Sequence, residues 1–160
     1  MIATRLALIA LACAATMPAS AQLIARKDLS YPIALTIAQA ALDDCKGRGY
    51  ATAVVVVDRG GNTVVALRGD NAGAHTMENA RRKAYTAMTF KMTTADFIKE
   101  MATRPVRREQ TTLPNVIAID GGVPIKVGND VVGGVGLSGS PGVDEQCVMA
   151  GMDKVKDQLQ

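Results

Sequence analysis

The sequence has no tryptophan, two phenylalanines, three tyrosines and a single histidine among its 160 residues. So few aromatic side chains disfavour a platform for single-stranded nucleic acid, because such platforms stack bases on aromatic rings. The net charge of +3 is also too small and too scattered for the basic face that nucleic acid requires. One histidine cannot supply the clustered ligands of a zinc hydrolase. We therefore expect neither a nucleic-acid partner nor a zinc enzyme.

The sequence also lacks an apolar run of the roughly 20 residues that a membrane-spanning helix needs. A shorter run, Leu6 to Ala15, follows Arg5 and precedes Ala19-Ser20-Ala21, which places small residues at −3 and −1 before Gln22. This order is typical of a secretory signal peptide at 1–21, although a buried N-terminal helix is the alternative. We expect cleavage before Gln22, export to the periplasm or the exterior, and no membrane span in the mature protein.

Cysteine is scarce, and its positions limit the redox chemistry. Of the three cysteines, Cys13 lies in the expected signal peptide, which leaves Cys45 and Cys147. Their wide separation excludes a C-x-x-C redox motif, and the absence of C-x-x-C-H excludes covalent c-type haem attachment. A cysteine pair in an oxidising compartment is a candidate disulfide. We predict a Cys45–Cys147 bridge that joins the first and last helices, with two buried free thiols as the alternative.

Hydrophobic periodicity divides the rest of the chain into helices and strands. The expected elements, in chain order, are a helix at 36–47, strands at 51–57 and 63–67, helices at 76–90 and 94–101, strands at 115–119, 124–127 and 131–137, and a helix at 144–159. Thr36 and Thr76 are the expected N-terminal caps of their helices, and Pro105 should end the helix before it. Short glycine-containing turns favour hairpins over helical crossovers, which predicts an antiparallel sheet in an α+β domain.

Four segments together carry a resemblance to a known family. They are VVVVDRGGNTVVALRGD (54–70), GAHTMENARRKAYTA (73–87), GGVPIKVGNDVVGGVGLSGSPG (121–142) and DEQCVMAG (144–151). These strings closely resemble the GlcG/HbpS family, which contains haem-binding proteins, proteins encoded with glycolate-utilisation enzymes, and the C-terminal domain of PduO-type proteins. The resemblance implies a profilin-like or roadblock-like α-β-α sandwich with a five-stranded antiparallel sheet, and homo-oligomers from dimers to larger rings. We expect an extension at 22–32 and the family domain at 33–160.

The only histidine, His75, lies where a glycine-containing loop meets the expected second helix. Neutral imidazole is a usual axial ligand of haem iron. The resemblance implies that His75 is the candidate haem-iron ligand, or a contact to a small anionic ligand, since family members often carry the string G-x-H-T. Gly73 and Thr76 belong to that string and join the candidate binding site. The alternative is a helix-start histidine that is hydrogen-bonded to the backbone.

Lys83 falls on the apolar stripe of the same helix, among alanines. Its ammonium group is a candidate partner for a haem propionate or a substrate carboxylate, and a lysine that extends to solvent along apolar surface is the alternative. Gly121 and Gly122 complete the candidate site, although paired glycines more commonly mark a turn. The backbone amides of 138–142, just before the last helix, are a further candidate for anion binding.

These residues support three hypotheses about function. The first is an exported protein that binds haem or a related tetrapyrrole non-covalently. The second is a binding protein or enzyme for a small carboxylate such as a 2-hydroxy acid, in which His75 is the base or hydrogen-bond donor and Lys83 holds the carboxylate. The third is a regulatory partner of a sensor or redox enzyme. No complete set of acid, base and nucleophile is visible in the sequence, so we assign no catalytic residue and favour a binding protein.

Overall fold

The computed structural model describes residues 24–160, and the expected signal peptide lies outside them. The elements are helices α1 (Tyr31–Gly47), α2 (Thr76–Phe90), α3 (Thr94–Thr103), α4 (Pro105–Gln110) and α5 (Asp144–Asp153), strands β1 (Ala53–Asp58), β2 (Thr63–Arg68), β3 (Gly122–Val127) and β4 (Asp130–Ser138), and a short 3-10 helix at Lys156–Gln158. Within 24–160, no helix is both long enough and apolar enough to cross a membrane.

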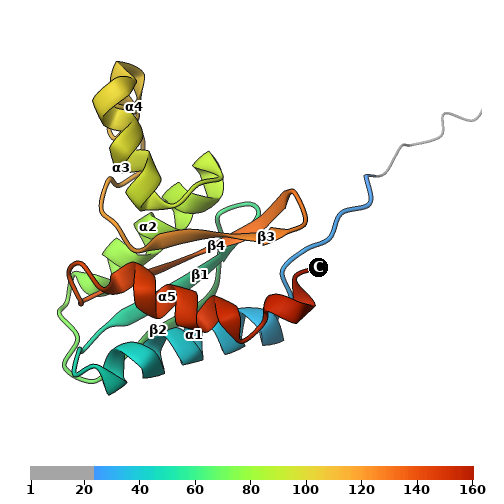
Figure 1. Cartoon of the computed structure of the whole chain (residues 1–160), viewed down its shortest axis with the longest axis vertical. Helices are drawn as coiled ribbons and strands as arrows, with labels where there is room; N and C mark the ends of the chain where they lie inside the picture. The colour runs from blue at the N-terminus through green and yellow to red at the C-terminus, as the bar shows by residue number, and fades with distance from the viewer. Residues whose placement is uncertain (1–23) are drawn as a thin grey trace, which may run out of the picture.

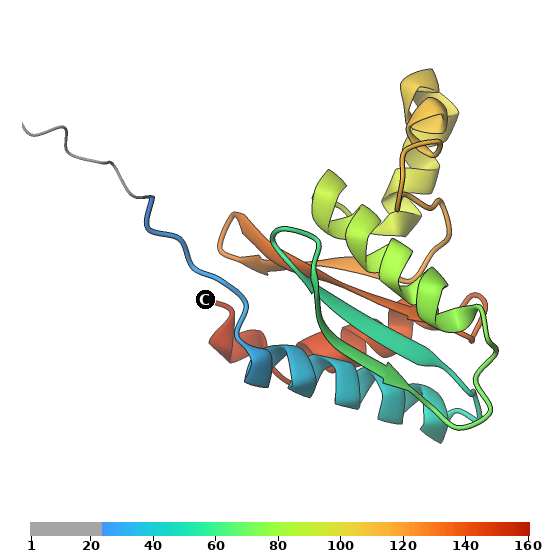
Figure 2. The ribbon, with the colours of Figure 1, turned by 180° about the vertical axis from the view of Figure 1, so that it is seen from behind.

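The strands form one antiparallel sheet in the order β2-β1-β4-β3, with helices on both faces (Figure 1). Helices α1 and α5 lie side by side on one face, and α2 lies across the other face (Figure 2). The α3–α4 pair projects away from the sheet in both views. The prediction of an α+β fold with an antiparallel sheet between helices is confirmed. The prediction of five strands is wrong, because the structure has four in the part of the chain that it describes.

The missing strand is the one expected at 115–119. Asn115 adopts the left-handed conformation, with φ of 70°, which interrupts an extended chain at its first residue. The backbone that follows is bonded to side chains of α2: the Arg82 guanidinium donates to the Val116 carbonyl at 2.6 Å, and the Ile117 amide donates to Thr86 Oγ1 at 2.9 Å. Because these backbone groups already have partners, the segment packs on α2 instead of extending the sheet.

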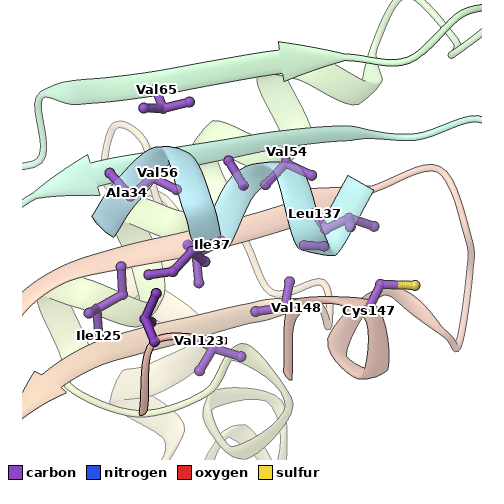
Figure 3. Packing of buried hydrophobic residues seen from close by; sticks show 14 of the residues in the cluster. Ala34, Ile37, Val54, Val56, Val65, Val123, Ile125, Leu137, Cys147 and Val148 are labelled. Atoms are coloured by element: carbon purple, nitrogen blue, oxygen red, sulfur yellow. The ribbon is translucent and has the colours of Figure 1, made fainter. Parts of the chain in front are cut away.

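Strand β1 is buried on both faces, which explains its uninterrupted valine run. Val54 and Val56 pack with α1 and α5, and Val55 and Val57 pack against α2. Alternation of side chains along a strand sends consecutive residues to opposite faces, so a strand covered on both sides needs apolar residues at every position. Figure 3 shows Val54 and Val56 together with Ile37 of α1 in the larger of the two clusters.

Helices α1 and α5 are joined covalently. The predicted disulfide between Cys45 and Cys147 is present, with the Cα atoms 5.5 Å apart, so the alternative of two free thiols is wrong for this structure. The helices approach closely because Gly151 of α5 has no side chain: a Cβ atom there would collide with the carbonyl oxygen of Ile37. The bridge closes a loop over a sequence separation of 102 residues, which includes the entire sheet.

Glycines of β4 bring α2 equally close to the opposite face of the sheet. A Cβ atom at Gly134 would collide with the carbonyl oxygen of Ala84, and one at Gly136 with the carbonyl oxygen of Ala80. The glycine-rich sequence of this strand is therefore explained by close backbone approach.

Both expected threonine caps are wrong. Helix α1 begins at Tyr31, with Pro32 in its first turn, where a missing N–H costs no helical hydrogen bond. Thr36 therefore lies inside the helix, and its hydroxyl donates to the Pro32 carbonyl at 2.9 Å. Thr76 is the first residue of α2, and its hydroxyl donates to the carbonyl of Gly73 at 2.8 Å. A threonine hydroxyl can either cap a helix by accepting from a backbone N–H or donate to a preceding carbonyl oxygen. The sequence alone does not show which of these two hydrogen bonds forms.

The ends of α3 and α5 were predicted with different success. Helix α3 ends at Thr103, before the Arg104-Pro105 pair, as expected for a residue that precedes proline. The same proline then begins α4, which was not predicted, because proline is accepted in the first turn of a new helix. The last helix ends at Asp153, short of the expected 159, and a 3-10 turn follows it.

Candidate functional site

A hollow of about 350 Å³ opens where α2 begins and β4 leads into α5. Four of the predicted residues line it, namely Gly73, His75, Thr76 and Lys83. Lining residues outside the predicted set include Asn79, Ile119, Asp120 and Asp144, and the loop at 138–142, a candidate for anion binding, contributes Ser138, Gly139 and Pro141. The loop before α2, the segment before β3 and the loop before α5 are far apart in the sequence, and the fold brings them to this one place.

His75 lies at the N-cap position of α2 and is exposed to solvent. Its side chain forms no capping hydrogen bond with the helix, which removes the main structural role that a helix-start histidine could have. Gly73 makes room for the imidazole: a Cβ atom at Gly73 would lie 3.0 Å from His75 Cε1 and 3.2 Å from Nδ1. The glycine therefore positions the ring next to the loop, and the imidazole remains open to a ligand.

Lys83 is almost completely buried, with 1% of its side chain exposed, so the interpretation of a lysine that reaches solvent is wrong. Its ammonium group donates to Asp144 Oδ2 at 2.6 Å and to the carbonyl oxygen of Leu137 at 2.9 Å. The carboxylate that Lys83 contacts is thus supplied by α5 of the same chain. A propionate or substrate carboxylate would have to displace Asp144 in order to take this place.

Asp144, the first residue of α5, has further donors besides Lys83. Its Oδ1 accepts hydrogen bonds from the backbone N–H of Ser140 at 2.8 Å and from the Ser140 hydroxyl at 2.6 Å. A carboxylate at a helix N-terminus is also favoured by the helix dipole. The loop amides at 138–142 were a candidate for binding an external anion, and in the structure the Ser140 amide holds this internal carboxylate.

Gly121 and Gly122 lie behind the ion pair and do not line the hollow. Gly121 has a φ of 101°, and a Cβ atom there would lie 2.5 Å from Asp144 Cβ and 3.3 Å from Lys83 Nζ. A Cβ atom at Gly122 would collide with the Lys83 carbonyl, and the Gly122 amide donates to Thr94 Oγ1 at 2.9 Å. These two glycines allow the chain to pass close to Lys83 and Asp144, so the structure gives them a packing role.

Several carboxylates lie near Glu145, in the first turn of α5. Burial raises the pKa of Glu145 above its ordinary value, and the nearby charges of Asp96 and Asp120 raise it further. Asp120 itself lines the hollow. Among residues 24–160, Lys83 is the only lysine or arginine in the lining, and Asp144 already pairs with it. The described part of the chain therefore supplies no unpaired lysine or arginine to the hollow, which counts against the role of Lys83 in the glycolate-type hypothesis.

Sequence analysis placed Asp144 only as the first residue of the helix expected at 144–159, without a partner. One signal could have assigned it a partner: a lysine on the apolar stripe of a buried helix requires a counter-charge when it does not reach solvent. Asp120 and Asn79 gave no comparable signal, because polar residues in loops and on helices are ordinarily solvated.

The fold and site define a three-layer α+β domain with one accessible histidine at the mouth of a small hollow. The model of a family described as "Haem degrading protein HbpS-like" matches residues 29–153, and the chain belongs to this HbpS-like family. The resemblance noted in the sequence is thereby confirmed.

Similar proteins support the same assignment. Protein GlcG of Escherichia coli K12 is 27% identical over 110 residues, which cover 69% of this chain and 81% of GlcG. A crystal structure of HbpS has a TM-score of 0.79 at 34% identity and covers 84% of this chain and 94% of its own. The structure of a complex of PduOC with haem has a TM-score of 0.70 at 23% identity, covers 79% of this chain and 94% of its own, and shows a shared fold.

Proposed function

We propose that this protein binds haem non-covalently at the hollow beside the start of α2, with an imidazole nitrogen of His75 as the axial ligand of the iron. The observation that carries the proposal is the exposed His75 side chain, which lines the hollow without making a helix cap. Membership of the HbpS-like family and the shared fold with the PduOC–haem complex support it.

The residues of the hollow fit part of a haem group. Ile119, which is 40% exposed, and Pro141 offer apolar surface for the macrocycle next to the imidazole. The volume of about 350 Å³ is at the lower end of the range for small-molecule sites, roughly 300–1,000 Å³. Lys83 would not hold a propionate, because it is paired with Asp144. Bound haem would supply a redox-active iron, and the protein would supply its ligand and apolar contacts.

The proposal places this binding outside the cytoplasm. Its support is the charge, apolar run and small-residue order at 1–21, together with a disulfide of the kind that persists in oxidising compartments. Mass spectrometry of the protein from a periplasmic or culture fraction tests this point, since a mature chain that begins at Gln22 is expected. We also propose a homo-oligomer, from the family resemblance, which light scattering after size exclusion tests.

The deciding experiment is a haem titration of residues 22–160 followed by absorbance. We expect a saturable Soret band in the intact protein and its loss or strong weakening in His75→Ala. Asn79→Ala is the matched control, because Asn79 lines the same hollow on the same helix. In His75→Gly, added free imidazole should restore the spectrum. Unchanged spectra and affinity in His75→Ala, with the thermal unfolding transition preserved, would remove His75 as the ligand.

A further inference from the structure

A second hollow, of about 410 Å³, lies between the last turns of α1 and the end of β2. Figure 2 shows the end of β2 beside the C-terminal end of α1. The segment 49–52 forms one side of this hollow, and Ala51 also lines the hollow beside His75. The two hollows therefore adjoin at Ala51. The haem proposal makes no use of the second one.

One residue that lines this second hollow has a buried polar atom without a partner. Thr52 lines it and is only 1% exposed, and its Oγ1 has no hydrogen-bond partner among residues 24–160. Thr52 lies just before β1, two residues before Val54. Because side chains alternate along an extended chain, Thr52 is expected on the same face as Val54 and Val56, whose side chains face α1 and α5. Buried hydroxyl groups are ordinarily hydrogen-bonded, so one without a partner at a hollow is a candidate contact for a ligand.

The walls and rim of the second hollow have contrasting chemistry. Leu42 and Tyr50, the latter 38% exposed, supply apolar surface. The charged rim residues are Asp43, Lys46, Arg68 and Asp70. Within the described part of the chain, none of these four charges forms a salt bridge. Arg68 does donate to the carbonyl oxygen of Ala72 at 2.5 Å, and Asp43 accepts from Gln39 at 3.0 Å. The rim thus offers two cations and two carboxylates without an ionic partner, and in residues 24–160 Lys46 and Asp70 make no side-chain hydrogen bond.

We propose that this hollow binds a small zwitterion with an apolar body, of the α-amino-acid class. The ligand carboxylate would face Lys46 and Arg68, its ammonium group would face the rim carboxylates, and its apolar part would lie on Leu42 and Tyr50. A simple dianion would be repelled by Asp43 and Asp70, and a simple amine would leave both cations unused. The volume of about 410 Å³ suits a small molecule.

Calorimetric titration of residues 22–160 with the protein amino acids tests the proposal. L-leucine is compared with 4-methylpentanoate, which lacks its ammonium group, and with 3-methylbutylamine, which lacks its carboxylate. We expect saturable binding of at least one apolar amino acid, with each truncated analogue weaker by about tenfold or more, since a hydrogen bond to a charged group has this effect. No saturable binding of any amino acid up to about 10 mM, a limit that corresponds to very weak affinity, overturns it.

Variants then locate the binding. Thr52→Val keeps the side-chain shape and removes the orphaned hydroxyl, so amino-acid affinity should fall while thermal stability is maintained or rises. Lys46→Gln should also weaken binding, and Lys154→Gln is the matched control because Lys154 is an exposed lysine outside the hollow. Affinity unchanged in both Thr52→Val and Lys46→Gln would place the ligand elsewhere. His75→Ala should leave amino-acid binding intact, which separates the failure of this proposal from failure of the haem proposal.

Discussion

The buried ion pair between Lys83 and Asp144 gives the sharpest test of the fold. Substitution Lys83→Met keeps an unbranched side chain that is shorter by one heavy atom, and it removes the charge. The Asp144 carboxylate, 5% exposed, would then retain only its two hydrogen bonds from Ser140, and the Leu137 carbonyl would lose the ammonium donor. Breaking a buried pair on one side costs about 3–5 kcal/mol, because an uncompensated charge stays inside.

Urea unfolding of residues 22–160, with the disulfide intact, measures this cost. For a small domain with a urea dependence of about 2 kcal/mol per molar, a loss of about 4 kcal/mol lowers the midpoint by about 2 M. Asp144→Asn should also be strongly destabilising. The double variant Lys83→Met/Asp144→Asn should lose less than the sum of the single variants, with a coupling of about 0.5–3 kcal/mol. A loss below about 1 kcal/mol for Lys83→Met, or strict additivity, would refute the argument from buried charge.

Three further predictions follow from other layers of the structure. Replacing Cys45 and Cys147 with serine should lower the free energy of unfolding by about 4–5 kcal/mol in the chain-entropy model, measured in urea, because the bridge closes a loop of about 100 residues. Glu145→Gln should stabilise the protein in thermal melts above about pH 5 and have little effect near pH 3. The pKa of Glu145 is raised in the folded state, so its contribution to stability is complete below the unfolded pKa. That contribution is lost as the pH rises through the folded pKa, and glutamine, which does not ionise, avoids the loss. Gly136→Ala should cost about 1–3 kcal/mol or more, because its Cβ atom would collide with the Ala80 carbonyl; a neutral effect in a denaturation curve would contradict the close packing of α2.

Most of the fold was predictable, because it follows from local pattern. The valine run of β1 and the alanine stripe of α2 have unambiguous periods, and both elements appear where they were expected. The strand expected at 115–119 failed because its backbone is bonded to Arg82 and Thr86, residues on a helix about thirty positions earlier in the chain. A β-branched run predicts an extended chain, but it does not specify whether the neighbouring backbone partner is a strand or a helix.

The candidate site was predictable only in part, for a similar reason. His75 and Lys83 were identified from their residue types and positions, and both line the same hollow. The partner of Lys83 lies 61 residues away, on the helix that follows β4, and no local signal connects the two. Sequence analysis predicted that Lys83 would bind the carboxylate of a ligand, whereas in the structure its partner is the carboxylate of Asp144. Long-range pairs of this kind depend on topology, which propensity does not encode.

The buried contacts nevertheless explain why the start of α2 is a suitable place for a binding histidine. Ser140 lies 3.1 Å from the sulfur of Cys45 and donates to Asp144, and Asp144 in turn holds Lys83 of α2. These contacts run from the disulfide on one face of the sheet to α2 on the other. The glycines of β4 let α2 lie directly on the sheet, and Lys83 ties it to the beginning of α5. The helix that carries His75 is therefore fixed through its buried side, while the imidazole stays exposed, which is the arrangement that a preorganised ligand site requires.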